Sequence, residues 1–215
     1  MFWGTVLSRD LTPDKARIFR IAHIDNVEMI LRDGMKCRNS GSSEDYKQIG
    51  NPELIDRRLH REVPCDPGGT LGDYVPFYFT PYSPMLYNIS TGYGVQRREN
   101  HEIVIFVSSL YKLAENGVPF VFTDRHAYLA YAEFTSDLNR LNDIDWVTLQ
   151  NRDFTRSDPS RFERYQAEAL VHREVPVEAL LGVATYNDAV KERVTAFAAV
   201  YGVELKVIAK ASWYF

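Results

Sequence analysis

One carboxylate stands out among the residues that could do chemistry. Glu168 begins the apolar run QAEALV, directly after the arginine-rich residues 151–164. A carboxylate beside cations can hold a sugar hydroxyl and offset the positive charge of an oxocarbenium-like transition state. The residue types alone favour a plainer interpretation, an edge-strand glutamate paired with an arginine, because charged side chains usually stay at the surface. The pattern therefore makes Glu168 a candidate catalytic residue but does not decide between the catalytic and the structural role.

Other catalytic motifs are missing from the sequence. The five histidines lack zinc-ligand spacing such as H-E-x-x-H, so we expect no metal. Nucleophile elbows, P-loops and Rossmann glycine patterns do not occur. Cys37 and Cys65 lie far apart without a C-x-x-C pair, and we interpret both as ordinary thiols.

Arginines cluster in polar, turn-rich segments although the chain as a whole is acidic. The formal net charge of -4 argues against a protein that grips long duplex DNA mainly by counterion release. A short nucleic-acid groove is still possible, because guanidinium groups can meet phosphates, and solvated loop charge is an equally good interpretation. The clusters are Arg57, Arg58 and Arg61; Arg97 and Arg98; and Arg152, Arg156, Arg161 and Arg164.

Length and composition bound the architecture that must position these residues. The 215 residues, 45% hydrophobic and 25% charged, suit one domain over residues 1–215 with a core and a cleft. The sequence contains neither a run of eighteen apolar residues nor a signal-peptide pattern at its start. We therefore expect a cytoplasmic protein without a membrane partner.

The first elements form a strand followed by a short helix. Ile18 and Ile21 indicate the strand, Asp25 resembles a helix N-cap with Glu28 three residues later, and Gly34 ends the helix. Residues 35–72 are rich in Gly, Ser, Asn, Asp and Pro, and a loop of that length usually carries function.

Later segments predict a sheet with flanking helices. Strands are expected in residues 73–89, 102–109, 118–124, 167–175, 182–186 and 204–210, where β-branched and aromatic residues gather. Residues 127–146 and about 188–201 are predicted to be largely helical. The fold class is therefore α+β, with antiparallel strands in a split, twisted sheet around a cleft.

Several ordered blocks resemble the DarT family, DNA ADP-ribosyltransferase toxins partnered with the macrodomain antitoxin DarG. The blocks are IFRIAHIDNVEMIL, IGNPELIDRR, GGTLGDYVPFYFTPYSPMLY, VPFVFTDRHAY, FERYQAEALV and SWYF, which span nearly the whole chain. The resemblance implies an ADP-ribosyltransferase fold with NAD as co-substrate in the cleft. It also implies transfer of ADP-ribose to a thymidine base of single-stranded DNA, release of nicotinamide, a block to replication, and a DarG-like macrodomain partner.

The resemblance gives Glu168 and Arg58 the catalytic roles. Glu168 would accept a hydrogen bond from the nicotinamide ribose 2'-hydroxyl and stabilise the positive charge as nicotinamide leaves. Arg58 matches the arginine that the family is proposed to use to take the proton from the thymine imide nitrogen. Because arginine is a poor base, we expect Arg58 to stabilise the thymine anion or to pass the proton to a neighbour.

The resemblance also implies the NAD contacts. Arg20 occupies a position where many related enzymes carry histidine, so that contact should differ here. Residues 35–55 resemble the NAD-covering loop, and Gly50 matches a position with little tolerance of bulk, which suggests unusual backbone angles or a close approach. For Asp25 we favour helix capping. The predicted NAD-binding residues are Arg20, Ile21, Ala22, His23, Asn26, Gly50 and Tyr78.

Residues 151–164 resemble the loop that recognises the substrate in this superfamily. Its arginines could take phosphates while Phe154 stacks on a base. A base modified at its pairing edge must be unpaired, which explains a preference for single strands. The predicted DNA-binding residues are Tyr82, Met85, Arg125, His126, Phe154, Arg161 and Arg164.

Three alternatives remain open from the sequence. A sister branch of the family modifies guanosine, although the blocks here look closer to the thymidine branch. A catalytically inactive single-strand binding module is the second, and consumption of NAD would separate it from an enzyme. The third is an NAD-using RNA phosphotransferase on a similar fold, which would use a pair of basic residues in place of Glu168.

Overall fold

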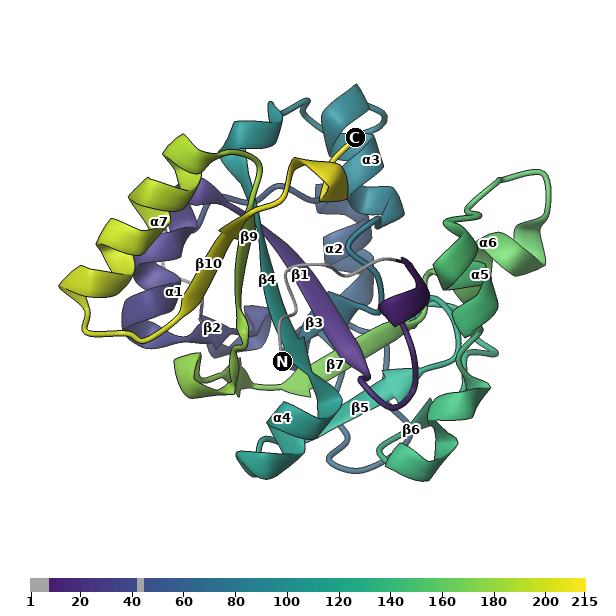
Figure 1. Cartoon of the computed structure of the whole chain (residues 1–215). Coiled ribbons are helices and arrows are strands. Elements are labelled where there is room, and N and C mark those ends of the chain that lie inside the picture. Colours follow the sequence, from purple (N-terminus) through teal and green to yellow (C-terminus); the bar gives the residue numbers. More distant parts are fainter. Residues whose placement is uncertain (1–7, 42–44) are drawn as a thin grey trace.

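The fold is built on a mostly antiparallel sheet (Figure 1). The structure is a computed structural model that describes residues 8–41 and 45–215. Within them, eight strands follow the order β10-β9-β4-β1-β3-β7-β5-β6, and β9 and β10 pair in parallel. The bounds are β1 Arg17–His23, β3 Tyr74–Tyr78, β4 Ile103–Ser109, β5 Phe120–Thr123, β6 Phe134–Thr135, β7 Glu168–His172, β9 Gly182–Thr185 and β10 Lys206–Ala209. The predicted α+β class is confirmed.

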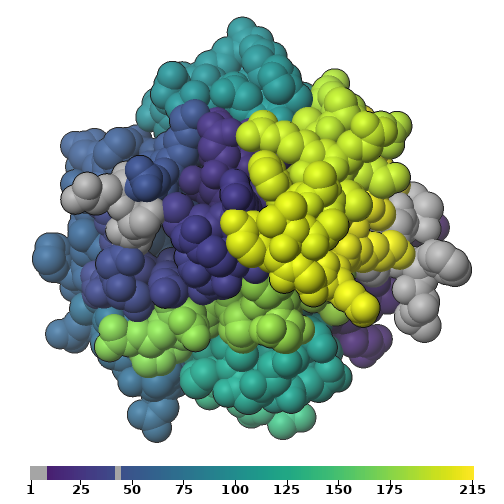
Figure 2. Space-filling view, turned by 90° about the vertical axis from the view of Figure 1, so that its left-hand side faces the viewer, coloured from purple at the N-terminus to yellow at the C-terminus, as the bar shows by residue number. Residues whose placement is uncertain are grey.

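Helices and a small second sheet surround these strands. Strands β2 (Met35–Lys36) and β8 (Glu174–Val175) pair with each other. The helices are α1 Val27–Asp33, α2 Pro52–Arg58, α3 Pro84–Thr91, α4 Leu110–Glu115, α5 Trp146–Asn151, α6 Pro159–Tyr165 and α7 Asp188–Val200. Helix α7 covers β9 and β10 beside α1 (Figure 2), whereas α5 and α6 lie at the opposite end of the sheet (Figure 1). Across the described part of the chain, helices are too short or too polar to cross a bilayer.

The sheet opens between β1 and β3. Strand β1 pairs with β4 along its whole length, but its register with β3 contains a single pair, Phe19 with Tyr78. Beyond that pair, the Arg20 guanidinium spans the gap and donates to the Pro76 carbonyl at 2.7 Å. Strand β3 pairs fully with β7, so Tyr78 stands opposite Glu168. The divergence places Glu168 two strands from β1, beside the predicted cleft.

The core explains why β1 and β4 form the centre of the sheet. All seven residues of β4 are buried, as expected of a strand covered on both faces. On β1, the fully buried Phe19 meets the Trp213 ring edge to face at 5.4 Å. This contact fixes β1 at the point where the sheet divides.

The prediction of a strand over residues 73–89 is wrong in its second half. The strand ends at Tyr78, and residues 84–91 form α3. Ser83 caps α3 by accepting from the Leu86 amide, Pro84 occupies the first turn, and Gly92 adopts a left-handed φ of 78° at its end. The aromatic composition hid these capping signals.

The prediction that residues 127–146 are largely helical is also wrong. They form turns, the short strand β6 and the 3-10 helix Leu138–Asp143. Thr135 accepts from the Asp137 amide, and Asp137 accepts from the Asn139 amide. Such local side-chain bonds compete with an α-helix for the same backbone groups.

Other predicted boundaries need smaller corrections. Asp25 does not cap a helix, because it lies within the 3-10 turn Ile24–Asn26 and its carboxylate binds Lys47 and Arg193. The expected loop of residues 35–72 contains α2, and the arginine-rich residues 151–164 contain most of α6. Residues 167–175 divide into β7 and β8 at Arg173, whose φ is 64°. Gly34 ends α1 as predicted.

We expect Phe19→Ala to destabilise the fold by about 3–5 kcal/mol, because it removes a fully buried ring from the centre of the sheet. Urea unfolding followed by tryptophan fluorescence measures the change. The control is Val200→Ala, at a position that is 74% exposed, which should shift stability by less than about 0.5 kcal/mol. Equal effects of the two substitutions would contradict this view of the core.

Candidate active site

A buried ion pair joins the two residues predicted to be catalytic. The Arg58 guanidinium donates through Nη1 to Glu168 Oε1 at 2.9 Å and through Nη2 to Oε2 at 2.6 Å. The Glu168 side chain is 3% exposed and that of Arg58 is 14% exposed. This two-point geometry is the strong form of an arginine–carboxylate contact. The structure therefore brings Arg58 and Glu168 together from positions 110 residues apart.

Local sequence signals place each partner. Asn51 caps α2 by accepting from the Leu54 amide, and Pro52 follows in the first turn, so Arg58 sits in the last turn of α2. Glu168 is the first residue of β7, which lies between β3 and β5. Glu168 is thus not the edge-strand residue of the plainer interpretation, although it does pair with an arginine.

The surroundings of Glu168 keep its carboxylate ionised. Burial by itself raises the pKa of Glu168, but the Arg58 charge and its hydrogen bonds outweigh burial and hold that pKa below the usual value. The Ala127 amide also donates to Oε1, at 3.1 Å. Burial lowers the pKa of Arg58, and Glu168 more than restores it. The site therefore holds one fixed negative and one fixed positive charge.

His126 lies next to this pair as a neutral imidazole. Its Nε2 is 3.8 Å from Glu168 Oε1, and burial lowers the pKa of His126. Nδ1 accepts from the Tyr128 amide, so the proton of the neutral ring is on Nε2, facing Glu168. In this arrangement His126 is a donor, and its acceptor nitrogen is already occupied.

A cavity of about 310 Å³ extends from Arg58 along the open side of β1 and β3. Cations and apolar side chains line it together, including Arg20, Lys36, Arg38, Arg58, Met29, Ile30, Ile55 and Leu71. Such a lining fits a dinucleotide, because the cations suit a pyrophosphate and the apolar groups suit the ring systems. The described residues contain no cluster of metal ligands.

The predicted NAD residues fall into different places. Side chains alternate along a strand, so Arg20 and Ala22 share one face of β1 while Ile21 and His23 share the other. Arg20 lines the cavity beside Arg58. His23 lines a second cavity with His101 and Arg193. From that face, Ile21 and His23 could reach the first cavity only through their backbone.

Tyr78 stands opposite Glu168, and Gly50 packs against Met85 and Ile55. The Tyr78 hydroxyl contacts the Met85 sulfur at 3.8 Å, and burial, followed by the Glu168 charge, raises the pKa of Tyr78. A Cβ on Gly50 would stand 3.1 Å from Met85 Cε and 3.2 Å from Ile55 Cδ1. Gly50 does not have a left-handed φ, so the constraint at this position is the close approach of the Met85 and Ile55 side chains.

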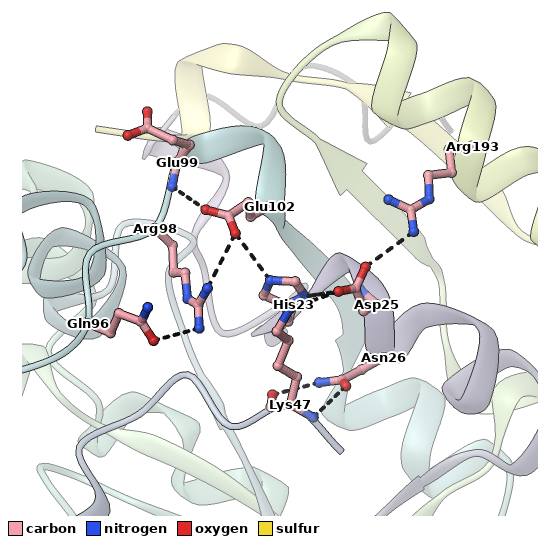
Figure 3. Close-up of polar contacts among 9 residues, drawn as sticks. All are labelled: His23, Asp25, Asn26, Lys47, Gln96, Arg98, Glu99, Glu102 and Arg193. Carbon is pink, nitrogen blue, oxygen red and sulfur yellow. Dashed lines mark hydrogen bonds and ion pairs between the residues drawn. The ribbon is translucent and has the colours of Figure 1, made fainter. Parts of the chain in front are cut away.

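Asn26 holds the segment that borders the cavity (Figure 3). Its Nδ2 donates to the Lys47 carbonyl at 2.9 Å, and its Oδ1 accepts from the Lys47 amide at 2.8 Å. The Lys47 ammonium reaches the Asp25 carboxylate at 2.9 Å, and Arg193 contacts the same group from α7. Tyr46 and Gln48, on either side of Lys47, line the cavity. Residues 42–44 of the predicted covering loop lie outside the described residues.

Several of the predicted DNA residues already have partners within the fold. The Arg152 guanidinium lies over the ring of the buried Tyr82, 3.5 Å from the ring centre. Phe154 is partly buried against Tyr165 at 5.2 Å between ring centres. The remaining arginines of the set form ion pairs: Arg125 with Asp124, Arg161 with Asp153 and Asp158, and Arg164 with Asp145.

Sequence reasoning missed three contributors to this site. Thr123 accepts from the Glu168 amide at 3.1 Å, and the Ala127 amide binds the Glu168 carboxylate. Lys47 anchors residues 46–48, which border the cavity, through Asp25 and Asn26. The residue types give no signal for the bonds of the Glu168 and Ala127 amides, because contacts between distant parts of the chain decide their partners. An Asn-Pro cap before α2 was the one local signal available for Arg58.

Comparison with known proteins gives consistent matches. A family model described as "ssDNA thymidine ADP-ribosyltransferase, DarT" matches residues 19–215. A DNA ADP-ribosyl transferase of Escherichia coli O127:H6 (strain E2348/69 / EPEC) is 48% identical over 212 residues, 97% of each chain. Thermus sp. 2.9 DarT in complex with ADP-ribosylated ssDNA aligns with a TM-score of 0.87 at 35% identity, over 94% of this chain and 98% of that one. The same enzyme with NAD+ aligns with a TM-score of 0.84 at 34% identity, over 94% and 99%.

We expect the free energy of unfolding to fall more steeply with decreasing pH in the wild type than in the Glu168→Gln variant. The folded-state pKa of Glu168 is depressed, so its stabilising effect is present above the unfolded value of about 4.3 and is lost as pH falls through the folded value. Near neutral pH, Glu168→Gln should cost about 3 kcal/mol or more, because it leaves Arg58 buried without a counter-charge. Urea unfolding across a pH series measures both effects. Parallel pH curves for the two proteins would exclude this role of the pair.

We expect Asn26→Ala to release the backbone at Lys47. Loss of the side-chain acceptor should raise hydrogen exchange of the Lys47 amide by about tenfold, the equivalent of roughly one buried hydrogen bond. Amide exchange measured by NMR or mass spectrometry tests this. Asn139→Ala is the control, because Asn139 is exposed and bonds to Asp137 within its own turn. An unchanged rate at Lys47 in Asn26→Ala would show that other contacts hold the segment.

Proposed function

Because this chain belongs to the DarT family of ssDNA thymidine ADP-ribosyltransferases, we propose that its Arg58–Glu168 site transfers ADP-ribose from NAD to a thymidine base of single-stranded DNA. The chain is an NAD-dependent DNA ADP-ribosyltransferase, and NAD is its co-substrate. The observation that carries the residue assignment is the buried, two-point ion pair that Glu168 forms with Arg58, which itself lines the cavity.

Glu168 is suited to hold the nicotinamide ribose. An ionised carboxylate has about four acceptor positions, and Arg58 with the Ala127 amide uses three of them. The free position on Oε2 can accept a hydrogen bond from the ribose 2'-hydroxyl. The fixed negative charge then stabilises the positive charge that develops on the sugar as nicotinamide leaves.

Arg58 is suited to stabilise the attacking base. The thymine imide nitrogen bonds to C1' of the ribose as the bond from C1' to nicotinamide breaks, and its proton is lost to solvent water. Loss of that proton puts a negative charge on the base. The Arg58 guanidinium keeps its proton, because Glu168 holds the pKa of Arg58 above its usual value. Arg58 therefore acts through charge and not as a base. His126 has its acceptor nitrogen occupied by the Tyr128 amide, so it assists as a hydrogen-bond donor.

The remaining proposed contacts follow from position. Arg20 and Tyr78 border the open side of the sheet and are assigned to NAD, with Ala22, Gly50 and the backbone of Ile21 and His23 beside them. Both the Nδ2 and the Oδ1 of Asn26 bind the Lys47 backbone, so its proposed contribution to NAD binding is to hold residues 46–48, which border the cavity. His126 lies 3.8 Å from Glu168, and Met85 contacts Tyr78, which stands opposite Glu168. We assign His126 and Met85 to DNA on that ground, and Tyr82, Arg125 and Phe154 from the resemblance to the DarT family.

We further propose that the protein is a toxin controlled by a DarG-like macrodomain. An ADP-ribose on the pairing edge of thymine prevents base pairing and thereby blocks copying of the strand. A cell that makes such an enzyme in its cytoplasm, where NAD and replicating DNA are present, needs a partner that removes the group. Adding a DarG macrodomain to the modified oligonucleotide should return its mass to the starting value, and an unchanged mass would exclude this partner.

The activity is tested with NAD and four single-stranded oligonucleotides that each lack one base. Mass spectrometry should detect one added ADP-ribose on every oligonucleotide except the one without thymine. Glu168→Gln should abolish the gain, because an uncharged amide cannot offset the positive charge on the ribose. Glu53→Gln is the matched control, since Glu53 is an exposed residue of α2.

The outcomes separate the candidates. If the mass gain required guanine in place of thymine, the enzyme would modify guanosine. Full modification by Glu168→Gln would overturn the role of Glu168. Binding of the oligonucleotides without any release of nicotinamide would favour an inactive binding module.

A further inference from the structure

Residues 152–164 carry four arginines whose charges are not equivalent. Arg161 contacts Asp153 at 2.6 Å and Asp158 at 3.5 Å, and Arg164 contacts Asp145 at 3.0 Å. A guanidinium that is already paired with carboxylates has less to gain from a phosphate. Arg161 and Arg164, the two that the sequence analysis chose, are therefore the weaker candidates for binding DNA.

Arg152 and Arg156 hold their charge without such compensation. Neither forms an ion pair with a carboxylate among residues 8–41 and 45–215, and both side chains lie against aromatic rings. The Arg156 guanidinium is 4.5 Å from the Tyr93 ring centre and 5.6 Å from that of Phe162. Arg152 also donates from Nη2 to the Tyr82 hydroxyl at 2.5 Å, which uses one of its five N–H groups. Ring contacts orient a guanidinium, and the other N–H groups of Arg152 and those of Arg156 are available to an anion.

Exposed aromatic rings continue from these arginines along α3. Tyr93 is 60% exposed, Tyr87 is 41% exposed and Phe215 is 42% exposed. Tyr87, Phe154 and Phe215 contact one another with ring centres 5.3–5.9 Å apart. Rings held in place by other rings offer flat surfaces to a base at little cost in side-chain entropy.

This surface is continuous with the catalytic site. Phe154 packs on Tyr165, which lies three residues before Glu168 and whose hydroxyl donates to the Tyr82 carbonyl at 3.0 Å. At its start, α3 carries Met85, which contacts Tyr78, and Tyr78 stands opposite Glu168. A chain leaving the ion pair can therefore follow α3 from Met85 past Tyr87 to Tyr93.

We propose that the surface formed by Tyr87, Tyr93, Arg152, Arg156 and Phe215, the α3 track, binds the nucleotides that flank the target base. This inference rests on the proposed function and adds the path of the strand outside the catalytic pocket. Guanidinium groups without a carboxylate partner can bind phosphates, and exposed rings can stack on bases. Proteins that bind single-stranded nucleic acid use this combination. A duplex keeps its bases stacked inside, so the rings select single strands.

Binding of two oligonucleotides without NAD tests the proposal. The first is a trinucleotide with a central thymidine, and the second is a longer strand that contains the same trinucleotide. We expect Tyr93→Ala to weaken binding of the longer strand about tenfold, the equivalent of one lost stacking contact, and to leave the trinucleotide unchanged. Arg156→Gln should weaken the longer strand and reduce the slope of log K against log salt by about 0.7.

Arg161→Gln is the matched control, because it removes a charge from the same segment that Asp153 already neutralises. It should leave both the affinity and the salt slope close to wild type. Wild-type affinity of Tyr93→Ala and Arg156→Gln for the longer strand would overturn the α3 track. Equal weakening of trinucleotide binding would also overturn the proposal, because the substituted residues would then act at the target base.

The two proposals fail in different ways. Release of nicotinamide from NAD without DNA reports on the catalytic pocket, and we expect both track variants to retain the wild-type rate. If wild type adds no ADP-ribose to any strand, the proposed function fails whatever the track variants bind. If wild type modifies both strands with equal KM, the track contributes nothing to the substrate and is excluded.

Discussion

The contact between Arg58 and Glu168 is the constraint on which the rest of the site depends. Two opposite charges are held away from water, and each is tolerated only because the other is there. Their geometry requires α2 and β7 to meet at one end of the gap between β1 and β3. The gap, the cap that starts α2 and the central position of β7 are therefore parts of one arrangement. Removing either charge leaves the other buried and unpaired.

The same pair explains how one small site can serve two opposite charges in a reaction. Glu168 remains an anion although it is buried, and Arg58 remains a cation, because each shifts the pKa of the other in the stabilising direction. A developing positive charge on a sugar and a developing negative charge on a base can then be met without reorganising water. Neutral His126 beside them adds a donor and no further charge.

Around the pair, the fold decides which charged residues remain available. Asp25 binds both Lys47 and Arg193 and so links the segment around Lys47 to α7 (Figure 3), which is a structural use of these charges. Carboxylates likewise occupy Arg161 and Arg164, whereas Arg152 and Arg156 rest on aromatic rings. Arginines with equal charge and similar sequence surroundings thus differ in what they can bind.

The sequence by itself determined the fold class, most strands, α7 and the nomination of Glu168, because alternating apolar residues and caps are local signals. It could not separate α3 from a strand, nor the turns of residues 127–146 from a helix, since aromatic composition fits either and side-chain bonds decided the outcome. Only the tertiary structure decided that Arg58 faces Glu168, that Asn26 holds Lys47, and that Arg164 is already paired with Asp145. Each of these contacts joins groups brought together by folding, and their energies depend on burial and on neighbouring charge, which no single stretch of sequence contains.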